Sequence, residues 1–242
     1  MAQAKRWAEA QAIEGLTLEV VRLGVRTPVL YFDIPATGGL DQERTVLLYG
    51  HLDKQPEMTG WREGTGPWIP VYEDGKLYGR GAGDDGYAVF AALAAIKALD
   101  QQGIPRAHCI GVIETCEESG SYDLPAYLDF LAPRLHEVQL VIALDSGAGN
   151  YDQIWATTSL RGLINGTLDV KVLTEGVHSG DAGGVVPSSF RIARQLLDRI
   201  DDSGTGVVEP TEFNCVIPSD RLQQAKLAAG ILGDSVWQRF PW

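Results

Sequence analysis

The chain has 242 residues, of which 45% are hydrophobic and 21% are charged, and its formal net charge is −12. This is the balance of a globular protein that is long enough for one large domain or two modest ones. The acidic character argues against nucleic acid and anionic membrane surfaces as partners.

The sequence predicts a cytoplasmic protein. No apolar run approaches the ~18 residues of a membrane span, and no apolar segment of a signal peptide follows the opening MAQAKRWAEA. The three cysteines, Cys109, Cys116 and Cys215, lack CxxC spacing. An odd set of this kind is no disulfide framework and fits a reducing compartment.

Strands and helices alternate over the first part of the chain. The apolar patterns predict strands at residues 17–24, 28–34, 45–49, 107–115 and 140–144, and helices at residues 3–14, 86–99 and 122–132. The last three strands are nearly all apolar, as in strands buried on both faces. Asp74-Gly75 predicts a hairpin within residues 71–79. We therefore expect an α/β layer with parallel strand pairs.

The pattern changes near residue 160. Residues 163–173 alternate like an antiparallel, half-exposed strand, and a helix is expected at residues 187–201. This texture predicts a second, α+β unit, with the division between residues 1–160 and 161–242.

Acidic and imidazole side chains follow the three strands expected to be buried. His51 and Asp53 follow the first, Glu117-Glu118 the second and Asp145 the third. Because ligands of open α/β sheets bind beyond the carboxyl ends of the strands, these groups should converge on one edge. A further aspartate, Asp84, lies in the Gly-rich stretch that enters the helix at residues 86–99.

Each group also has a simpler interpretation when it is taken alone. Asp84 or Asp85 would suit a helix cap, His51 a satisfied buried histidine, Asp145 a turn, and Glu117-Glu118 a solvated loop. Together, however, these groups would repel one another strongly unless a cation neutralised them. The set therefore favours a metal site.

The residue types fit hydrolytic metal chemistry. Zinc accepts histidine nitrogen and carboxylate oxygen, and a catalytic site keeps an open position for water. A carboxylate that bridges two metals lets both polarise one water, while a second, unligated carboxylate is needed as general base. Adjacent glutamates can divide these tasks. In His51-x-Asp53, a carboxylate can orient the imidazole that binds metal.

Five segments resemble the M20 family of metallopeptidases, which includes dipeptidases, carboxypeptidases and N-acyl-amino-acid deacylases. They are LLYGHLDKQP (47–56), KLYGRGAGDDGYAV (76–89), ETCEESGS (114–121), ALDSGAG (143–149) and GVHSGDAGG (176–184). The resemblance implies a zinc-exopeptidase-like mixed sheet flanked by helices. It also implies an inserted α+β, ferredoxin-like lid domain that forms a homodimer, beginning near Arg161-Gly162.

The resemblance also implies the roles of individual residues. Two Zn²⁺ ions, with Co²⁺ or Mn²⁺ as alternatives, would be held by His51, Asp84, Glu118 and Asp145, with Asp84 as the bridge. Asp53 would orient His51, and Glu117 would be the general base. His178 would reach the partner subunit's active site and stabilise the oxyanion. The substrate would be a small peptide or an N-acyl amino acid, with a dipeptidase-like enzyme favoured by His51-x-Asp53-x-Gln55-Pro56.

One departure from the family pattern concerns the second metal, for which the family supplies a histidine from the C-terminal part of the catalytic domain. The four histidines are His51, His108, His136 and His178. His108 begins a predicted strand and His136 lies near a helix end, so neither is well placed. We therefore expect an N-terminal portion of a longer, truncated enzyme that is inactive alone.

Two other classes of function stay open. One is a non-catalytic protein of the same fold that binds metal or an amino-acid derivative. The other is a dinucleotide- or phosphate-binding protein, suggested by the Gly-rich stretch at 79–86. That stretch lacks GxGxxG spacing, and its two aspartates would repel phosphate.

Overall fold

The computed structural model describes residues 1–242. The chain forms two compact units, Met1–Ala156 and Thr157–Trp242, which are described separately. Neither unit contains a helix with the length and apolar character needed to cross a membrane.

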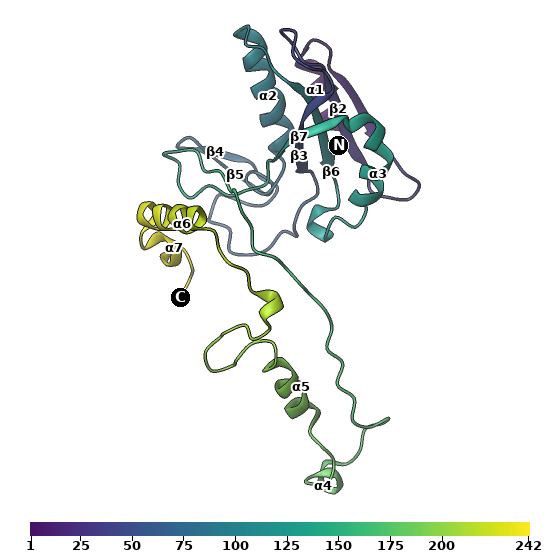
Figure 1. The fold of residues 1–242 in the computed structure, drawn as a ribbon, viewed down its shortest axis with the longest axis vertical. Helices are drawn as coiled ribbons and strands as arrows, with labels where there is room; N and C mark the ends of the chain where they lie inside the picture. Colours follow the sequence, from purple (N-terminus) through teal and green to yellow (C-terminus); the bar gives the residue numbers. More distant parts are fainter. The chain divides into compact units, whose positions relative to one another are not determined.

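A five-stranded mixed sheet forms the centre of the first unit (Figure 1). Its strands are β1 (Thr17–Val21), β2 (Val29–Ile34), β3 (Arg44–His51), β6 (His108–Glu114) and β7 (Glu137–Ala143), in the order β1-β2-β6-β3-β7. β3 runs parallel to both β6 and β7, whereas β2 is antiparallel to β1 and β6. The expected parallel pairs are therefore confirmed. His51 pairs with Glu114 in the register, so the carboxyl ends of β3 and β6 meet at one edge.

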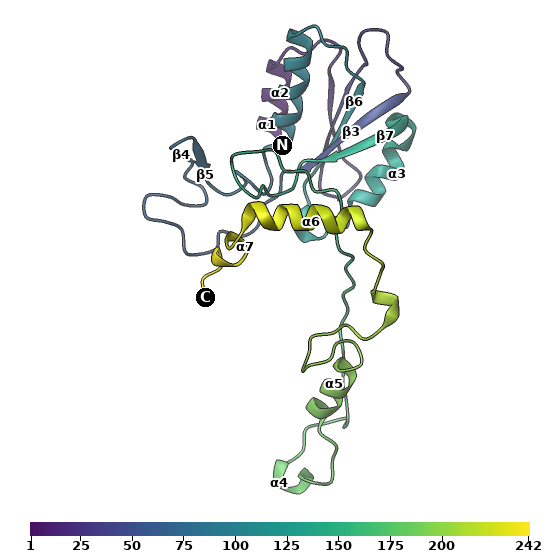
Figure 2. The same cartoon turned by 60° about the vertical axis from the view of Figure 1, so that its left-hand side comes forward.

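Helices cover both faces of this sheet (Figure 2). α1 (Ala2–Ala10) and α2 (Ala88–Gln101) pack on one face, where Leu30 and Phe32 of β2 contribute to the core. α3 (Leu124–Leu135) covers the other face through Tyr127 and Leu131. Alternate residues of β2 point to opposite faces, so this strand contributes to both cores.

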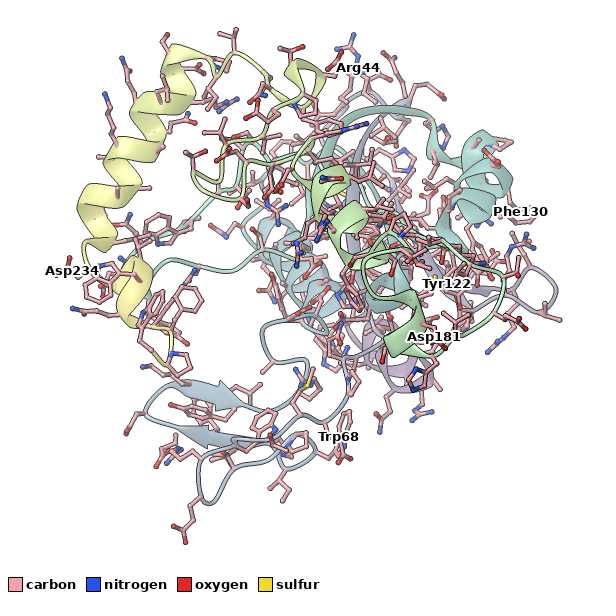
Figure 3. All side chains as sticks on the ribbon, turned by 90° about the horizontal axis from the view of Figure 1, so that it is seen from below. Arg44, Trp68, Tyr122, Phe130, Asp181 and Asp234 are labelled. Atoms are coloured by element: carbon pink, nitrogen blue, oxygen red, sulfur yellow. The ribbon has the colours of Figure 1, made fainter.

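A hairpin of β4 (Val71–Glu73) and β5 (Lys76–Tyr78) forms a separate two-stranded sheet, near the labelled Trp68 in Figure 3. Asp74 and Gly75 form its turn with φ values of 50° and 76°. Positive φ at both central residues is what a tight hairpin turn requires. The hairpin predicted from Asp74-Gly75 is confirmed.

The prediction that β7 is buried was wrong. This strand occupies one edge of the sheet, and Leu140, Val141 and Ile142 are exposed. An apolar run fits burial on both faces, but burial also needs elements that cover those faces. The side chains of β7 stay largely exposed, although its backbone pairs with β3 as expected.

The second unit is helical. It contains α4 (Ser179–Ala182), α5 (Ser189–Leu197), the 3₁₀ helix η2 (Thr211–Phe213), α6 (Ser219–Leu232) and α7 (Ser235–Gln238). The helix expected at residues 187–201 is present as α5. The strand predicted at residues 163–173 is not formed, and the sole β-bridge of this unit joins Asp201 and Val208. A strand needs a hydrogen-bonding neighbour, and no segment pairs with 163–173, so the sheet of a ferredoxin-like unit is absent here.

Candidate metal centre

The centre of the candidate site is the imidazole of His51, the last residue of β3. Its side chain is completely buried, and its Nε2 atom has no hydrogen-bond partner. Three carboxylate oxygens surround this nitrogen: Oδ1 of Asp84 at 3.4 Å, Oδ2 of Asp145 at 3.7 Å and Oε2 of Glu117 at 3.8 Å. A buried polar atom without a partner is costly, so this arrangement suits a bound cation.

The spacing of these atoms suits a metal ion. Ligand atoms around a tetrahedral zinc lie roughly 3.3 Å apart, given metal–ligand bonds of about 2 Å. His51, Asp84 and Asp145 each offer a ligand atom, and these atoms all lie within 4.8 Å of one another. Nitrogen and carboxylate oxygen together suit Zn²⁺ and similar divalent cations. The residues therefore fit a bound metal.

The sequence left open whether Asp84 or Asp85 is a helix cap or a metal ligand. In the structure the two aspartates have different surroundings. The carboxylate of Asp85 is buried and accepts from the backbone N–H groups of Gly86, Tyr87 and Ala88, at the start of α2. Asp85 therefore satisfies backbone donors in the turn that leads into α2, as a capping side chain does, although Tyr87 is the N-cap residue itself. Asp84 makes none of these bonds, and its largely exposed carboxylate lies beside His51 Nε2.

Asp53 holds several parts of the site together. Its carboxylate lies 3.4 Å from His51 Nδ1, and its backbone carbonyl lies 3.2 Å from the same nitrogen. The two carboxylate oxygens also accept from the backbone N–H groups of Glu117 and Glu118, at 3.2 and 3.0 Å. Asp53 thus fixes both the imidazole and the loop that carries the paired glutamates.

Glu117 and Glu118 face different partners, although they are neighbours in the 3₁₀ helix η1 (Glu117–Ser119). Glu117 lies beside His51, as described above. Glu118 accepts from the backbone N–H of Gln55 at 3.1 Å and from its side-chain amide at 2.5 Å. Both glutamates line an open cavity of about 620 Å³, together with Gly83, Asp84, Asp145, Ser146 and Gly147.

The pKa values of three groups in the site are raised above their usual values. Burial, together with the carboxylates of Asp145 and Glu118, raises the pKa of Glu117 against the opposing effect of His51. Burial and nearby carboxylates likewise raise the pKa of Asp145. Burial lowers the pKa of His51, but the carboxylates of Asp145, Glu117, Asp85 and Asp53 outweigh it, so the net pKa is raised.

Sequence reasoning missed Glu114, the last residue of β6. Its buried carboxylate accepts from the hydroxyl groups of Tyr49 at 2.6 Å and Ser121 at 2.8 Å, and the Cys116 thiol lies 3.2 Å away. Burial and this carboxylate raise the pKa of the Tyr49 phenol. The signal that could have identified Glu114 is its place as the acidic last residue of a strand in which every residue is buried.

His178 lies in the second unit, at the start of α4. Its side chain is 80% exposed, and its Nδ1 accepts from the backbone N–H of Gly180 at 3.1 Å. His108 and His136 lie together in the first unit, where their ring centroids are 4.9 Å apart. Both belong, with Asp33, to a different group of side chains from the cluster around His51.

Solved structures of known enzymes share this fold. The alignment with the structure of human carnosine dipeptidase 1 covers 94% of this chain and 49% of that chain, with a TM-score of 0.55 and 24% identity. The alignment with the M20 family metallo-carboxypeptidase Sso-CP2 from Sulfolobus solfataricus covers 96% of this chain and 53% of that chain, with a TM-score of 0.63 and 21% identity. These likenesses confirm the expected mixed α/β fold.

Related sequences place the chain in a family. The Homo sapiens Beta-Ala-His dipeptidase is 31% identical over 72% of this chain and 35% of its own length. The Cysteinylglycine-S-conjugate dipeptidase of Corynebacterium striatum is 29% identical over 86% of this chain and 45% of its own length. The chain thus spans less than half the length of these relatives. Residues 47–210 match the description "Peptidase family M20/M25/M40", and the chain therefore belongs to this family of metallopeptidases.

Proposed function

We propose that this chain contributes to the metal-dependent hydrolysis of a peptide or N-acyl amide bond, with a dipeptide as the favoured substrate. One observation carries the proposal. The buried Nε2 of His51 has no hydrogen-bond partner and is surrounded by the carboxylates of Asp84, Asp145 and Glu117. The names of two relatives, both dipeptidases, support the choice of substrate.

Four side chains would hold metal. His51 and Asp145 would bind the first ion, Glu118 the second, and Asp84 would bridge the two. Zn²⁺ suits these ligands, with Co²⁺ or Mn²⁺ as alternatives. The bound ions would supply Lewis acidity toward a water molecule and the scissile carbonyl.

Glu117 would act as the general base. Its carboxylate lines the cavity beside His51, where a free carboxylate can accept a proton and then release it. It would take a proton from the attacking water at Oε2 and deliver it to the leaving nitrogen. Asp53 would act as a positioning residue, because it contacts His51 and the backbone of Glu117 rather than the reacting atoms.

His178 would supply an oxyanion donor to the active site of a partner subunit in a homodimer. Its Nδ1 accepts a hydrogen bond from Gly180, so the proton of the neutral ring lies on Nε2. That N–H group is free to donate, because the side chain is largely exposed. Residues 161–242 would form part of the lid, and residues 1–160 part of the catalytic domain.

The proposal also includes a cytoplasmic location and the inactivity of the chain by itself. The absence of disulfides among the three cysteines suits the cytoplasm. The chain alone would be inactive, because no histidine follows His178 to complete the second metal site.

The first experiment measures metal binding by the 242-residue chain. Equilibrium dialysis with Zn²⁺ should show an ion that Glu117→Gln retains and that His51→Ala loses. If Glu117→Gln loses the ion and Glu118→Gln retains it, the proposed roles of the two glutamates are reversed. Hydrolysis of a panel of dipeptides and N-acyl amino acids by the chain alone should stay at the level of the metal-only blank.

The second experiment tests catalysis in a chimera that appends the C-terminal portion of a dipeptidase relative. Glu117→Gln should reduce kcat by about 10²- to 10⁴-fold, the usual contribution of a general base, with metal content unchanged. A folded, metal-loaded chimera that hydrolyses no member of the panel would support the non-catalytic metal-binding alternative instead.

A further inference from the structure

A second group of metal-ligating side chains lies at the edge of the sheet opposite His51. His108 is the first residue of β6, and His136 directly precedes β7. Asp33 lies near the end of β2, which is antiparallel to β6, so it reaches the same edge. One ligand atom from each of these residues lies within 4.8 Å of the others. None of them belongs to the centre around His51.

Both imidazole rings are oriented by a hydrogen bond to Nδ1. His108 Nδ1 lies 2.6 Å from the backbone carbonyl of Gln42, and His136 Nδ1 lies 3.2 Å from Oε2 of Glu43. Because carbonyl and carboxylate oxygens only accept, each Nδ1 must carry a proton. In a neutral ring the Nε2 atom is then unprotonated and can bind a cation. Metal-bound histidines have this arrangement, with the second nitrogen donating to a carbonyl or a carboxylate.

Asp33 completes the group. Its Oδ1 lies 2.9 Å from His108 Nε2, and its Oδ2 accepts from the Tyr31 hydroxyl at 3.1 Å. With Nδ1 of His108 protonated, a neutral ring would set two acceptors, Nε2 and Oδ1, against each other. A cation between them removes this conflict. The required change is small, since ligand atoms around tetrahedral zinc lie roughly 3.3 Å apart.

We propose that Asp33, His108 and His136 form a second binding site for a divalent first-row cation such as Zn²⁺ or Co²⁺. Two nitrogens and one oxygen match the preference of these ions, and three protein ligands leave a position for water. His108 is almost fully buried, whereas the His136 side chain is 29% exposed and gives the ion a route of entry. The bound ion connects β2, β6 and the turn before β7, so it stabilises the first unit.

A simple ion pair between Asp33 and His108 is the competing explanation. That pair needs neither His136 nor the Nδ1 contact between His136 and Glu43. The experiment therefore targets these two residues, which lie outside the pair. His178→Ala is a matched control, because this histidine is also exposed but lies in the second unit.

The test measures cation binding in the 242-residue chain after the first centre has been disabled by His51→Ala, Asp84→Asn and Asp145→Asn. Titration with Co²⁺, followed by visible absorption, should reveal one bound equivalent, and Zn²⁺ should displace it. In this background His136→Ala should weaken binding at least 10-fold. Glu43→Gln should weaken binding by about 10- to 100-fold, the usual effect of losing a partner of a metal ligand. His178→Ala should leave it unchanged.

The wild-type chain provides a second measurement that does not depend on the multiple variant. Its Zn²⁺ stoichiometry should fall by one equivalent in His136→Ala and stay constant in His178→Ala, with helical content checked by circular dichroism. The proposal is overturned if the disabled background binds no Co²⁺, or if binding is the same with and without His136. Neither result would bear on the centre around His51, because the two groups share no residue.

Discussion

The backbone N–H of His51 donates to Oδ2 of Asp85 at 3.0 Å, while Oδ1 of the same carboxylate caps the start of α2. One buried side chain therefore connects the end of β3 to the helix that follows the Gly-rich loop. This connection sets the position of His51 relative to Asp84, which directly precedes Asp85 in that loop. The start of α2 and the candidate metal centre consequently depend on the same residue.

Asp85→Ala should lower the free energy of unfolding of the metal-free chain by on the order of 2 kcal/mol, because it removes a helix cap and leaves the buried His51 N–H without a partner. Asp85→Asn keeps one carbonyl acceptor and should cost less. Urea denaturation with a chelator present measures both. A value for Asp85→Ala within about 0.5 kcal/mol of wild type, typical of neutral surface changes, would contradict the connecting role.

Asp53→Ala should weaken Zn²⁺ binding by about 10- to 100-fold, because His51 and the loop of Glu117 and Glu118 lose a shared acceptor. Competition with a chromogenic chelator measures the affinity. Asp129→Ala is the matched control, since this aspartate is exposed on α3. Equal affinities for the two variants would show that the imidazole and the loop are held by other contacts.

Gly50→Ala should destabilise the first unit by about 1–3 kcal/mol, the usual cost of overpacking. A β-carbon at this position would collide with the side chain of Ala88 and approach Oδ2 of Asp85 to 2.6 Å. Gly230→Ala provides the contrast, because it lies within α6 in open space and should be neutral or slightly stabilising. Thermal denaturation of both variants distinguishes steric conflict from a general effect of replacing glycine.

The metal-free chain should lose stability as the pH rises. The pKa of His51 is higher in the folded state than in the unfolded state. Protonation of His51 therefore stabilises the fold fully below the unfolded pKa of ~6.5, and this stabilisation is lost as the pH rises past the folded pKa. Glu117 and Asp145 also have raised pKa values, so their charged forms begin to destabilise the fold above about pH 4. Urea midpoints measured with a chelator should therefore fall with pH.

Added Zn²⁺ should reverse this trend, because metal binds the deprotonated ligands and its stabilising effect grows as pH rises. His51→Gln should remove the part of the decline that belongs to the imidazole. An increase of the metal-free midpoint with pH between about 6 and 8 would contradict the raised pKa of His51.

The sequence predicted the elements around the site because their periodicity is local. The apolar runs ending at His51 and at Glu114 are short, are bounded by turn signals and pair in parallel as expected. The convergence of His51, Asp84, Glu117 and Asp145 followed from this topology. Periodicity could not decide which of Asp84 and Asp85 contacts the start of α2 and which lies beside His51, because both contacts depend on tertiary geometry.

The predictions failed where the local structure depends on contacts with other segments of the chain. Residues 163–173 have the alternation of a strand but no neighbouring strand in the second unit, so the pattern alone was insufficient. The group of Asp33, His108 and His136 was missed for a related reason. Its members come from β2, β6 and the turn before β7, and no spacing in the sequence reveals that they meet.

The exposed strand β7 has a practical consequence for handling the protein. Its outer edge presents unpaired backbone groups, and Leu140, Val141 and Ile142 place apolar surface on both faces of that edge. Such an edge is a template for strand-to-strand association. The purified 242-residue chain should therefore aggregate increasingly as it is concentrated. Val141→Lys should improve its solubility and leaves all of the proposed metal ligands in place.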